Sequence, residues 1–200
     1  IKMISSELTN NFTINDITEA GGTLSDFVGV ATTNYSCKFT LNLGNSTICS
    51  LEVPSNSFVD LATNSNNNSS NIFTITYDTV APVLTKVTAI TTPYNDTTPS
   101  FVFTTSESGT LTTDITEGFS TSSSVTTGSN QTVTFNTLPS GTYSGKTITV
   151  TDSANNSTSL SIPTFVIDTT APTLIPVTAI STPSNDTTPS FVFTTSESGT

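Results

Sequence analysis

The sequence predicts an all-β protein made of small antiparallel β-sandwiches joined end to end. Three observations lead to this class. Thr, Ser and Asn contribute 46, 30 and 18 of the 200 residues, a composition that favours strands and turns over helices. No segment shows sustained helical periodicity of its apolar residues. A stretch of 30 residues recurs at an offset of 90, which is the length of a whole small β-sandwich.

The recurring stretch sets the domain boundaries. Residues 81–110 recur at 171–200 with 25 of 30 positions identical. Similar joints, Asp-Thr-Val-Ala-Pro at 78–82 and Asp-Thr-Thr-Ala-Pro at 168–172, mark the repeat ends, and their prolines interrupt strand pairing and stiffen the connection. The predicted domains are residues 1–79, 80–169 and 170–200. The sequence reads as a fragment: we expect the first domain to lack its opening strand and the last to hold only the first strands of a further repeat.

In the second repeat, period-two alternation and β-branched runs between turn clusters predict the strands. They cover residues 84–90, 100–105, 110–113, 131–136, 142–151 and 158–167. The side chains expected to face inward are Phe101, Phe103, Val133, Phe135, Ile148 and Val150. In the last strand the apolar parity changes at Pro163, which predicts a bulge or bend. Six or seven short strands in about 90 residues are typical of two packed antiparallel sheets of the immunoglobulin type.

The first repeat is related in form but not in sequence detail. The same criteria predict strands over residues 11–17, 24–30, 35–41, 47–53 and 72–77. A long loop rich in Asn and Ser covers residues 54–71. Without its opening strand, this repeat would expose an open sheet edge.

Three motifs resemble the tandem bacterial Ig-like domains of large surface proteins. They are Asp-Thr-Thr-Ala-Pro-Thr at 168–173, Thr-Pro-Ser-Asn-Asp-Thr-Thr-Pro-Ser-Phe at 182–191 and Thr-Val-Thr-Asp-Ser-Ala-Asn-Asn at 149–156. Residues 1–79 are similar to a sister group of the same clan, through residues 11–17 and 22–25. The resemblance implies an extracellular location at the bacterial cell surface, arrays of repeats and frequent roles in adhesion.

Two turns depart from the pattern of the family that the chain resembles. Such domains often carry Asp-x-Ala-Gly-Asn in the last hairpin, whereas this chain has Asp-Leu-Ala-Thr-Asn at 60–64 and Asp-Ser-Ala-Asn-Asn at 152–156. Asn is the usual second choice for a left-handed turn residue, so we still expect a hairpin turn at 152–156.

Charge and composition exclude several functions. There is no His, and four Lys stand against fifteen carboxylates, for a net charge of -11. Without His a Ser-His-Asp catalytic site is impossible. Two Cys without His also cannot supply the four protein ligands of a zinc site. We predict that the chain is not an enzyme. A surface this acidic repels phosphate backbones, so no nucleic-acid binding is expected. No apolar run approaches the length of a membrane span, so no membrane insertion is predicted.

The two cysteines flank a predicted turn at residues 42–45. A hairpin centred on residue 43 would place Cys37 opposite Cys49, and the parity of both strands would direct both sulfurs toward the core. A cross-strand disulfide is therefore predicted. The alternative is a pair of buried thiols that act as small hydrophobic side chains.

Acidic and amide side chains gather near the joints. In an immunoglobulin-type repeat the penultimate hairpin loop lies near the entrance of the chain and the first loop lies near its exit. This topology predicts two groups: Asp78 with Asp152, Asn155 and Asn156, and Asp168 with Asn95 and Asp96. Carboxylate and amide oxygens without a nearby Lys are suitable ligands for Ca²⁺. We expect that the fold requires no cofactor and that Ca²⁺ is the ion these groups would bind. The alternative is that they only close turns by bonding their own backbone.

Three functions fit the sequence. The first is a structural spacer that supports adhesion; its partners are neighbouring repeats of the same chain, while other domains would bind a host-surface, cell-surface or glycan ligand. The second is a module that binds carbohydrate or protein, and the third is an accessory domain of a secreted enzyme. Glycan platforms usually expose aromatic faces, yet Trp is absent and Tyr94 is replaced by Ser184 in the next copy. This argues against an aromatic site in every repeat.

Overall fold

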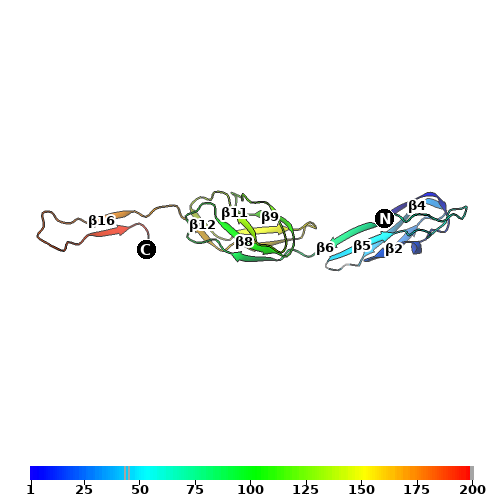
Figure 1. The fold of residues 1–200 in the computed structure, drawn as a ribbon, viewed down its shortest axis with the longest axis horizontal. Helices are drawn as coiled ribbons and strands as arrows, with labels where there is room; N and C mark the ends of the chain where they lie inside the picture. Colours follow the sequence, from blue (N-terminus) through cyan, green and yellow to red (C-terminus); the bar gives the residue numbers. More distant parts are fainter. Residues whose placement is uncertain (43, 45, 199–200) are drawn as a thin grey trace. The chain divides into compact units, whose positions relative to one another are not determined.

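The computed structural model describes residues 1–42, 44 and 46–198, and it confirms the all-β class (Figure 1). The strands pair in antiparallel sheets. In the described part of the chain, no helix is long and apolar enough to cross a membrane. The contacts divide the chain into two compact units. Unit 1 is Ile1–Val83, Ser106–Thr110 and Val150–Thr158, and unit 2 is Leu84–Thr105, Leu111–Thr149 and Ser159–Thr200.

The first repeat forms two three-stranded sheets. One has the order β1 (Lys2–Thr9), β4 (Thr32–Leu41), β3 (Gly22–Val28), and the other has the order β2 (Thr18–Ala20), β5 (Ser46–Glu52), β6 (Phe73–Asp78). Between them lies an apolar core of Phe12, Ile17, Tyr35, Cys37, Leu51 and Val53. The ring of Phe12 packs edge-on against Tyr35, with ring centroids 4.8 Å apart, a favourable arrangement for aromatic quadrupoles.

Three elements of the first repeat differ from the prediction, and one of them is the short strand β2, which was not predicted. The strand expected at 11–17 is wrong, because Ile14–Asp16 form a 3₁₀ helix in a capping box with Thr13. The backbone N–H of Thr13 donates to Asp16 Oδ2 at 2.7 Å, which satisfies a free donor at the helix start. Strand β1 was not predicted, because its inward-facing positions include only one apolar residue, Met3, while Ile4 faces outward and is exposed.

The buried hydroxyl of Tyr35 links β4 to the end of β1. Its Oη lies 2.7 Å from the backbone O of Thr32 and 3.0 Å from the backbone O of Thr9. We expect Tyr35→Phe to lower the free energy of unfolding by about 1–2 kcal/mol, because the ring packing is kept while the donor is lost. Urea denaturation of both proteins measures this difference, and an unchanged midpoint would contradict it.

The second repeat has the predicted two-layer arrangement. One sheet has the order β11 (Gln131–Thr134), β8 (Ser100–Thr105), β7 (Leu84–Thr88), and the other has the order β10 (Ser124–Val125), β9 (Gly109–Thr113), β13 (Thr147–Thr151), β14 (Ser157–Ser161). A further pair joins β12 (Gly141–Tyr143) to β15 (Phe165–Ile167). The predicted inward-facing side chains are all fully buried: Phe101, Phe103, Val133, Phe135, Ile148 and Val150.

Two long strands predicted in the second repeat are each divided in two. The strand predicted at 142–151 is interrupted before β13, where Gly145 adopts φ 64°, a left-handed conformation that glycine tolerates. The strand predicted at 158–167 breaks around Pro163, as the change of parity indicated, and β14 and β15 pair with different partners. The short strand β10 was not predicted, because two residues give no periodicity.

The third segment contains a two-stranded antiparallel sheet. Strand β16 (Leu174–Thr178) pairs with β17 (Val192–Thr195). The pairing corresponds to that of β7 with β8 at an offset of about 90, since Leu174 faces Thr195 as Leu84 faces Thr105.

Candidate functional site

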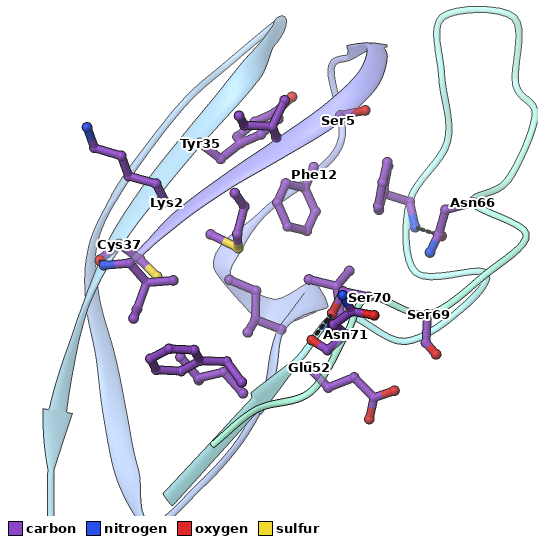
Figure 2. Close-up of a pocket in the computed structure, with 18 of the residues that line it drawn as sticks. Lys2, Ser5, Phe12, Tyr35, Cys37, Glu52, Asn66, Ser69, Ser70 and Asn71 are labelled. Carbon is purple, nitrogen blue, oxygen red and sulfur yellow. Dashed lines mark hydrogen bonds between the residues drawn. The ribbon is translucent and has the colours of Figure 1, made fainter. Parts of the chain in front are cut away.

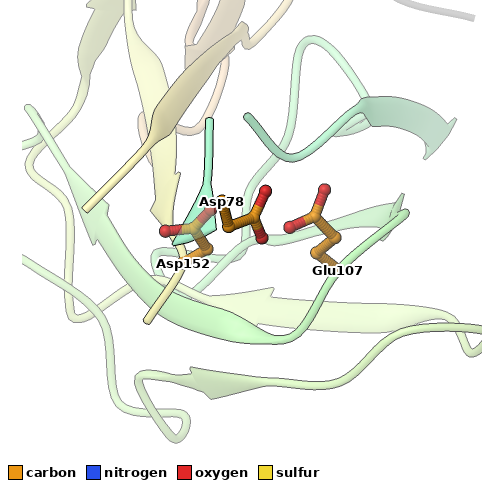
Figure 3. A group of neighbouring side chains, drawn as sticks. All are labelled: Asp78, Glu107 and Asp152. Carbon is orange, nitrogen blue, oxygen red and sulfur yellow. The ribbon is translucent and has the colours of Figure 1, made fainter. Parts of the chain in front are cut away.

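Three carboxylates far apart in the sequence form a cluster in unit 1 (Figure 3). They belong to Asp78, Glu107 and Asp152, and each offers an oxygen within 4.8 Å of the others. Asp78 ends β6, Glu107 lies between β8 and β9, and Asp152 follows β13. The cluster therefore concentrates hard anionic oxygens where three chain segments meet.

Asp152 closes the turn between β13 and β14. Its Oδ1 accepts hydrogen bonds from the backbone N–H groups of Ala154 at 2.7 Å and Asn156 at 2.9 Å. Its Oδ2 accepts one from Nδ2 of Asn156 at 2.9 Å. The side chain of Asn156, together with backbone N–H groups of the turn, lowers the pKa of Asp152, although burial opposes the shift. Asn155 takes the left-handed conformation with φ 69°, as expected for this position.

The same turn occurs in the first repeat. There Asp60 Oδ1 accepts from the backbone N–H of Asn64 at 2.8 Å, and Oδ2 accepts from its Nδ2 at 2.9 Å. Thr63 has φ 67° in the place of Asn155. Turn closure is thus a general property of this motif, and Asp152 is further a member of a cluster of three carboxylates.

The structure brings together most of the residues predicted at the first joint. Nδ2 of Asn156 donates to the backbone O of Asp78 at 3.1 Å as well as to Asp152. Oδ1 of Asp78 accepts from the backbone N–H of Val80 at 3.0 Å. For Asn155 the structure shows a backbone bond within the turn, from its N–H to the O of Asp152 at 3.4 Å.

Glu107 is a member of this cluster that the sequence did not predict. Partial burial raises its pKa, and the carboxylates of Asp78 and Asp152 raise it further. A signal was present: in an immunoglobulin-type sandwich the loop after the second strand lies at the same end as the penultimate hairpin. Glu197 repeats this residue at an offset of 90.

At the second joint, Asn95 and Asp168 line a polar pocket of about 270 Å³ together with Glu197. All three residues belong to unit 2. Asp96 was grouped with them in the prediction, but it is not among the lining residues. Its Oδ1 accepts from the N–H and Oγ1 of Thr98, both at 2.8 Å, and these bonds lower its pKa. Asp96 thus closes its own turn.

The donor set fits a hard cation. Ca²⁺ takes six to eight oxygen ligands, chiefly carboxylates, carbonyls and water. The three clustered carboxylates supply such oxygens, and bound Ca²⁺ would offset the repulsion that raises the pKa of Glu107. Calcium binding by either group stays a prediction.

The predicted cysteine pairing is wrong. Strands β4 and β5 do not form a hairpin: β4 pairs with β1 and β3, while β5 pairs with β2 and β6. The chain passes from one sheet to the other between them, and the predicted turn includes residues 43 and 45, which lie outside the described residues. Cys37 and Cys49 are buried free thiols, and Cys49 Sγ donates to the backbone O of Gly21 at 3.0 Å. Burial raises the pKa of Cys37, partly offset by the N-terminal ammonium. The alternative of two buried thiols therefore describes the structure.

Comparison with known proteins finds a family that matches the first repeat. No curated protein matches the chain. The family described as "Bacterial Ig-like domain" matches residues 1–77, the same residues whose two sheets and 60–64 turn are described above. The first repeat of this chain therefore matches the bacterial Ig-like domain family, as its sequence indicated.

Proposed function

We propose that the chain is a non-catalytic structural repeat of an exported surface protein, where it acts as a spacer that supports adhesion. Domains of the matched family are structural or ligand-binding modules and are generally non-catalytic. The observation that carries the spacer proposal is the repetition itself: 25 of 30 positions recur at an offset of 90. A spacer requires repetition of the fold and needs no site in each copy, whereas an enzyme needs one differentiated site.

The charge of the chain supports the same function. A net charge of -11 on 200 residues makes neighbouring chains repel one another. Similar repeats would otherwise be prone to associate with one another. The acidic surface would thus keep the domains separate while the apolar cores remain inside.

The spacer proposal is tested by adding copies. Chains that carry one or two further copies of residues 80–169 after Thr169 are compared with the parent chain by small-angle X-ray scattering. We expect the maximum dimension to grow by the same increment with each copy. A maximum dimension that does not grow would contradict the spacer proposal. Binding of the parent chain to a glycan array would favour the binding-module alternative.

We propose further that Ca²⁺ binds the cluster of Asp78, Glu107 and Asp152 and stabilises the fold around it. The support is the spacing of the three carboxylates, within 4.8 Å, and the raised pKa of Glu107. Extracellular modules bind Ca²⁺ with dissociation constants of about 10⁻⁴ to 10⁻³ M. At about 10 mM Ca²⁺ such binding would stabilise the folded state by about 1–3 kcal/mol.

Replacement of Glu107 tests the calcium proposal. We expect the Tm of the parent chain to be higher in about 10 mM Ca²⁺ than in a chelator, and this difference to disappear in Glu107→Gln. In the chelator the variant should be at least as stable as the parent, because the raised pKa means that folding disfavours the ionised carboxylate. The exposed Glu19 in β2 provides the control, since Glu19→Gln should keep the calcium response. Equal Tm values with and without Ca²⁺ would refute the site.

A further inference from the structure

One edge of β1 has no strand partner in the described part of the first repeat. In the sheet order β1-β4-β3, strand β4 covers one edge of β1. On the other edge only Thr9, at the end of the strand, forms a single bridge, with Asp60. A row of unpaired backbone N–H and C=O groups is a template for a further strand.

The second repeat shows what lies at this position. The turns at 60–64 and 152–156 have the same hydrogen bonds, and they align the sheet β2-β5-β6 with β9-β13-β14. In the opposite sheet, β1 then corresponds to β8. Each comes before the first strand of the aligned sheet, β2 or β9, and each pairs with a later strand, β4 or β11. Strand β8 has partners on both edges, and β7 covers the edge that is free in β1.

Backbone hydrogen bonds identify which groups of β1 face the free edge. The N-terminal ammonium of Ile1 donates to the O of Cys37 at 2.8 Å, and the N–H of Cys37 donates to the O of Ile1 at 3.1 Å. This exchange makes Ile1 and Cys37 a hydrogen-bonded pair, and the pattern alternates along an antiparallel ladder. The N–H and C=O groups of Lys2 and Ile4 therefore point away from β4. The side chain of Ile4 is 80 % exposed.

An apolar groove of about 490 Å³ lies beside this edge (Figure 2). Its lining includes Ile1, residues 2–5 of β1 and, on the opposite rim, the polar residues Asn66, Ser70 and Asn71. Core side chains such as Phe12 contribute the apolar part of the lining. An added strand would thus find backbone partners on β1 and an apolar surface for every second side chain.

We propose that the free edge of β1 and the adjoining groove form an acceptor site for one additional antiparallel β-strand with the sequence character of the repeats' own opening strand. Two such strands are present in the chain. Leu84–Thr88 pairs with β8, and Leu174–Thr178 pairs with β17 in a related register. Both have an apolar residue at the first and fourth positions. Within β7 only Leu84 is partly buried, and the segment that follows β7 contains the buried Ile90 and the fully buried Pro99.

An N-terminal extension of the full chain tests the proposal. Residues 81–99, which hold β7 and its connection to β8, are placed directly before Ile1. We expect the amides of Lys2 and Ile4 to be protected from hydrogen exchange by at least about tenfold, and the Tm of the first repeat to rise by at least about 5 °C. An extension of the same length and composition in scrambled order is the matched control and should give neither effect.

Proline substitutions separate edge pairing from general stabilisation. Ile4→Pro removes an N–H that faces the free edge, so it should leave the Tm of the unextended chain nearly unchanged and abolish both effects of the extension. Met3→Pro removes a ladder bond to β4 and should destabilise the unextended chain. Equal effects of native and scrambled extensions, or protection that persists in Ile4→Pro, would overturn the proposal. A dimer of the unextended chain that Ile4→Pro abolishes would also overturn it, because the occupant would then be a second copy.

Discussion

Phe103→Ala is expected to lower the free energy of unfolding of the second repeat by about 3–5 kcal/mol. Phe103 lies in β8, the central strand of its sheet, and its side chain is 0 % exposed. Its ring stacks on that of Phe101 with centroids 6.5 Å apart. Removing the ring loses its transfer free energy and leaves a cavity that a close-packed sandwich cannot fill. Since small domains are stable by only about 5–15 kcal/mol, differential scanning calorimetry should show a separate, much lower transition.

The chain contains a matched control for this substitution. Phe193 occupies the same position one period later, in β17, and its side chain is 52 % exposed. Phe193→Ala should therefore change the thermogram little. A similar loss of stability in both variants would show that burial is not what makes Phe103 important.

Asp152→Ala is expected to lower the Tm of the second repeat by several degrees at neutral pH. Asp152 is 8 % exposed, and its carboxylate accepts three hydrogen bonds from the turn it closes. The variant leaves these donors without an acceptor, a cost larger than the net value of the bonds. Asp152→Asn, which keeps one carbonyl oxygen, should have an intermediate Tm. Thermal melts of the three proteins in a chelator measure the series without any contribution from bound cations.

The effect of Asp152→Ala should depend on pH with a definite sign. Hydrogen bonds to the ionised carboxylate lower its folded-state pKa, so its contribution is fully present above the pKa of the unfolded chain, about 3.9. The contribution is lost as the pH falls through the lower folded-state value. The Tm difference between parent and variant should thus be largest at neutral pH and shrink in acid. A difference that stays constant down to about pH 2 would contradict this origin.

The sequence predicts the second repeat better than the first, and the reason is physical. In the second repeat, strands such as Ser100–Thr105 alternate large apolar residues with Thr or Val, and the burial of Phe101 and Phe103 follows directly from period two. In β1 the corresponding inward positions hold Met3 and Ser5, so the strand is formed by pairing with β4 rather than signalled by its own side chains. Local capping by Thr13 and Asp16 likewise overrode the β-branched pattern of residues 11–17.

The candidate site was only partly predictable. Asp78, Asp152 and Asn156 follow from the topology of a sandwich, because the ends of strands fix which loops are neighbours. Glu107 follows from the same rule but lacks a motif of its own. The cysteine pairing could not be deduced from parity, since parity sets the face of each strand and leaves open which sheet the strand joins. A turn of four residues can connect two strands of one sheet or carry the chain across the sandwich.

The division of the last strand at Pro163 has a consequence for how such a chain can change in evolution. Strand β14 completes the sheet that contains β13, whereas β15, a few residues later, pairs with β12, and Ile167 forms a parallel bridge with Tyr94. The final ten or so residues of the repeat thus pair with segments from both its beginning and its end. An insertion or deletion that ends within them and is not a whole period long leaves the repeat incomplete. Copy number can therefore rise or fall only by crossovers one full period apart. The length of the array then changes in steps of one whole repeat.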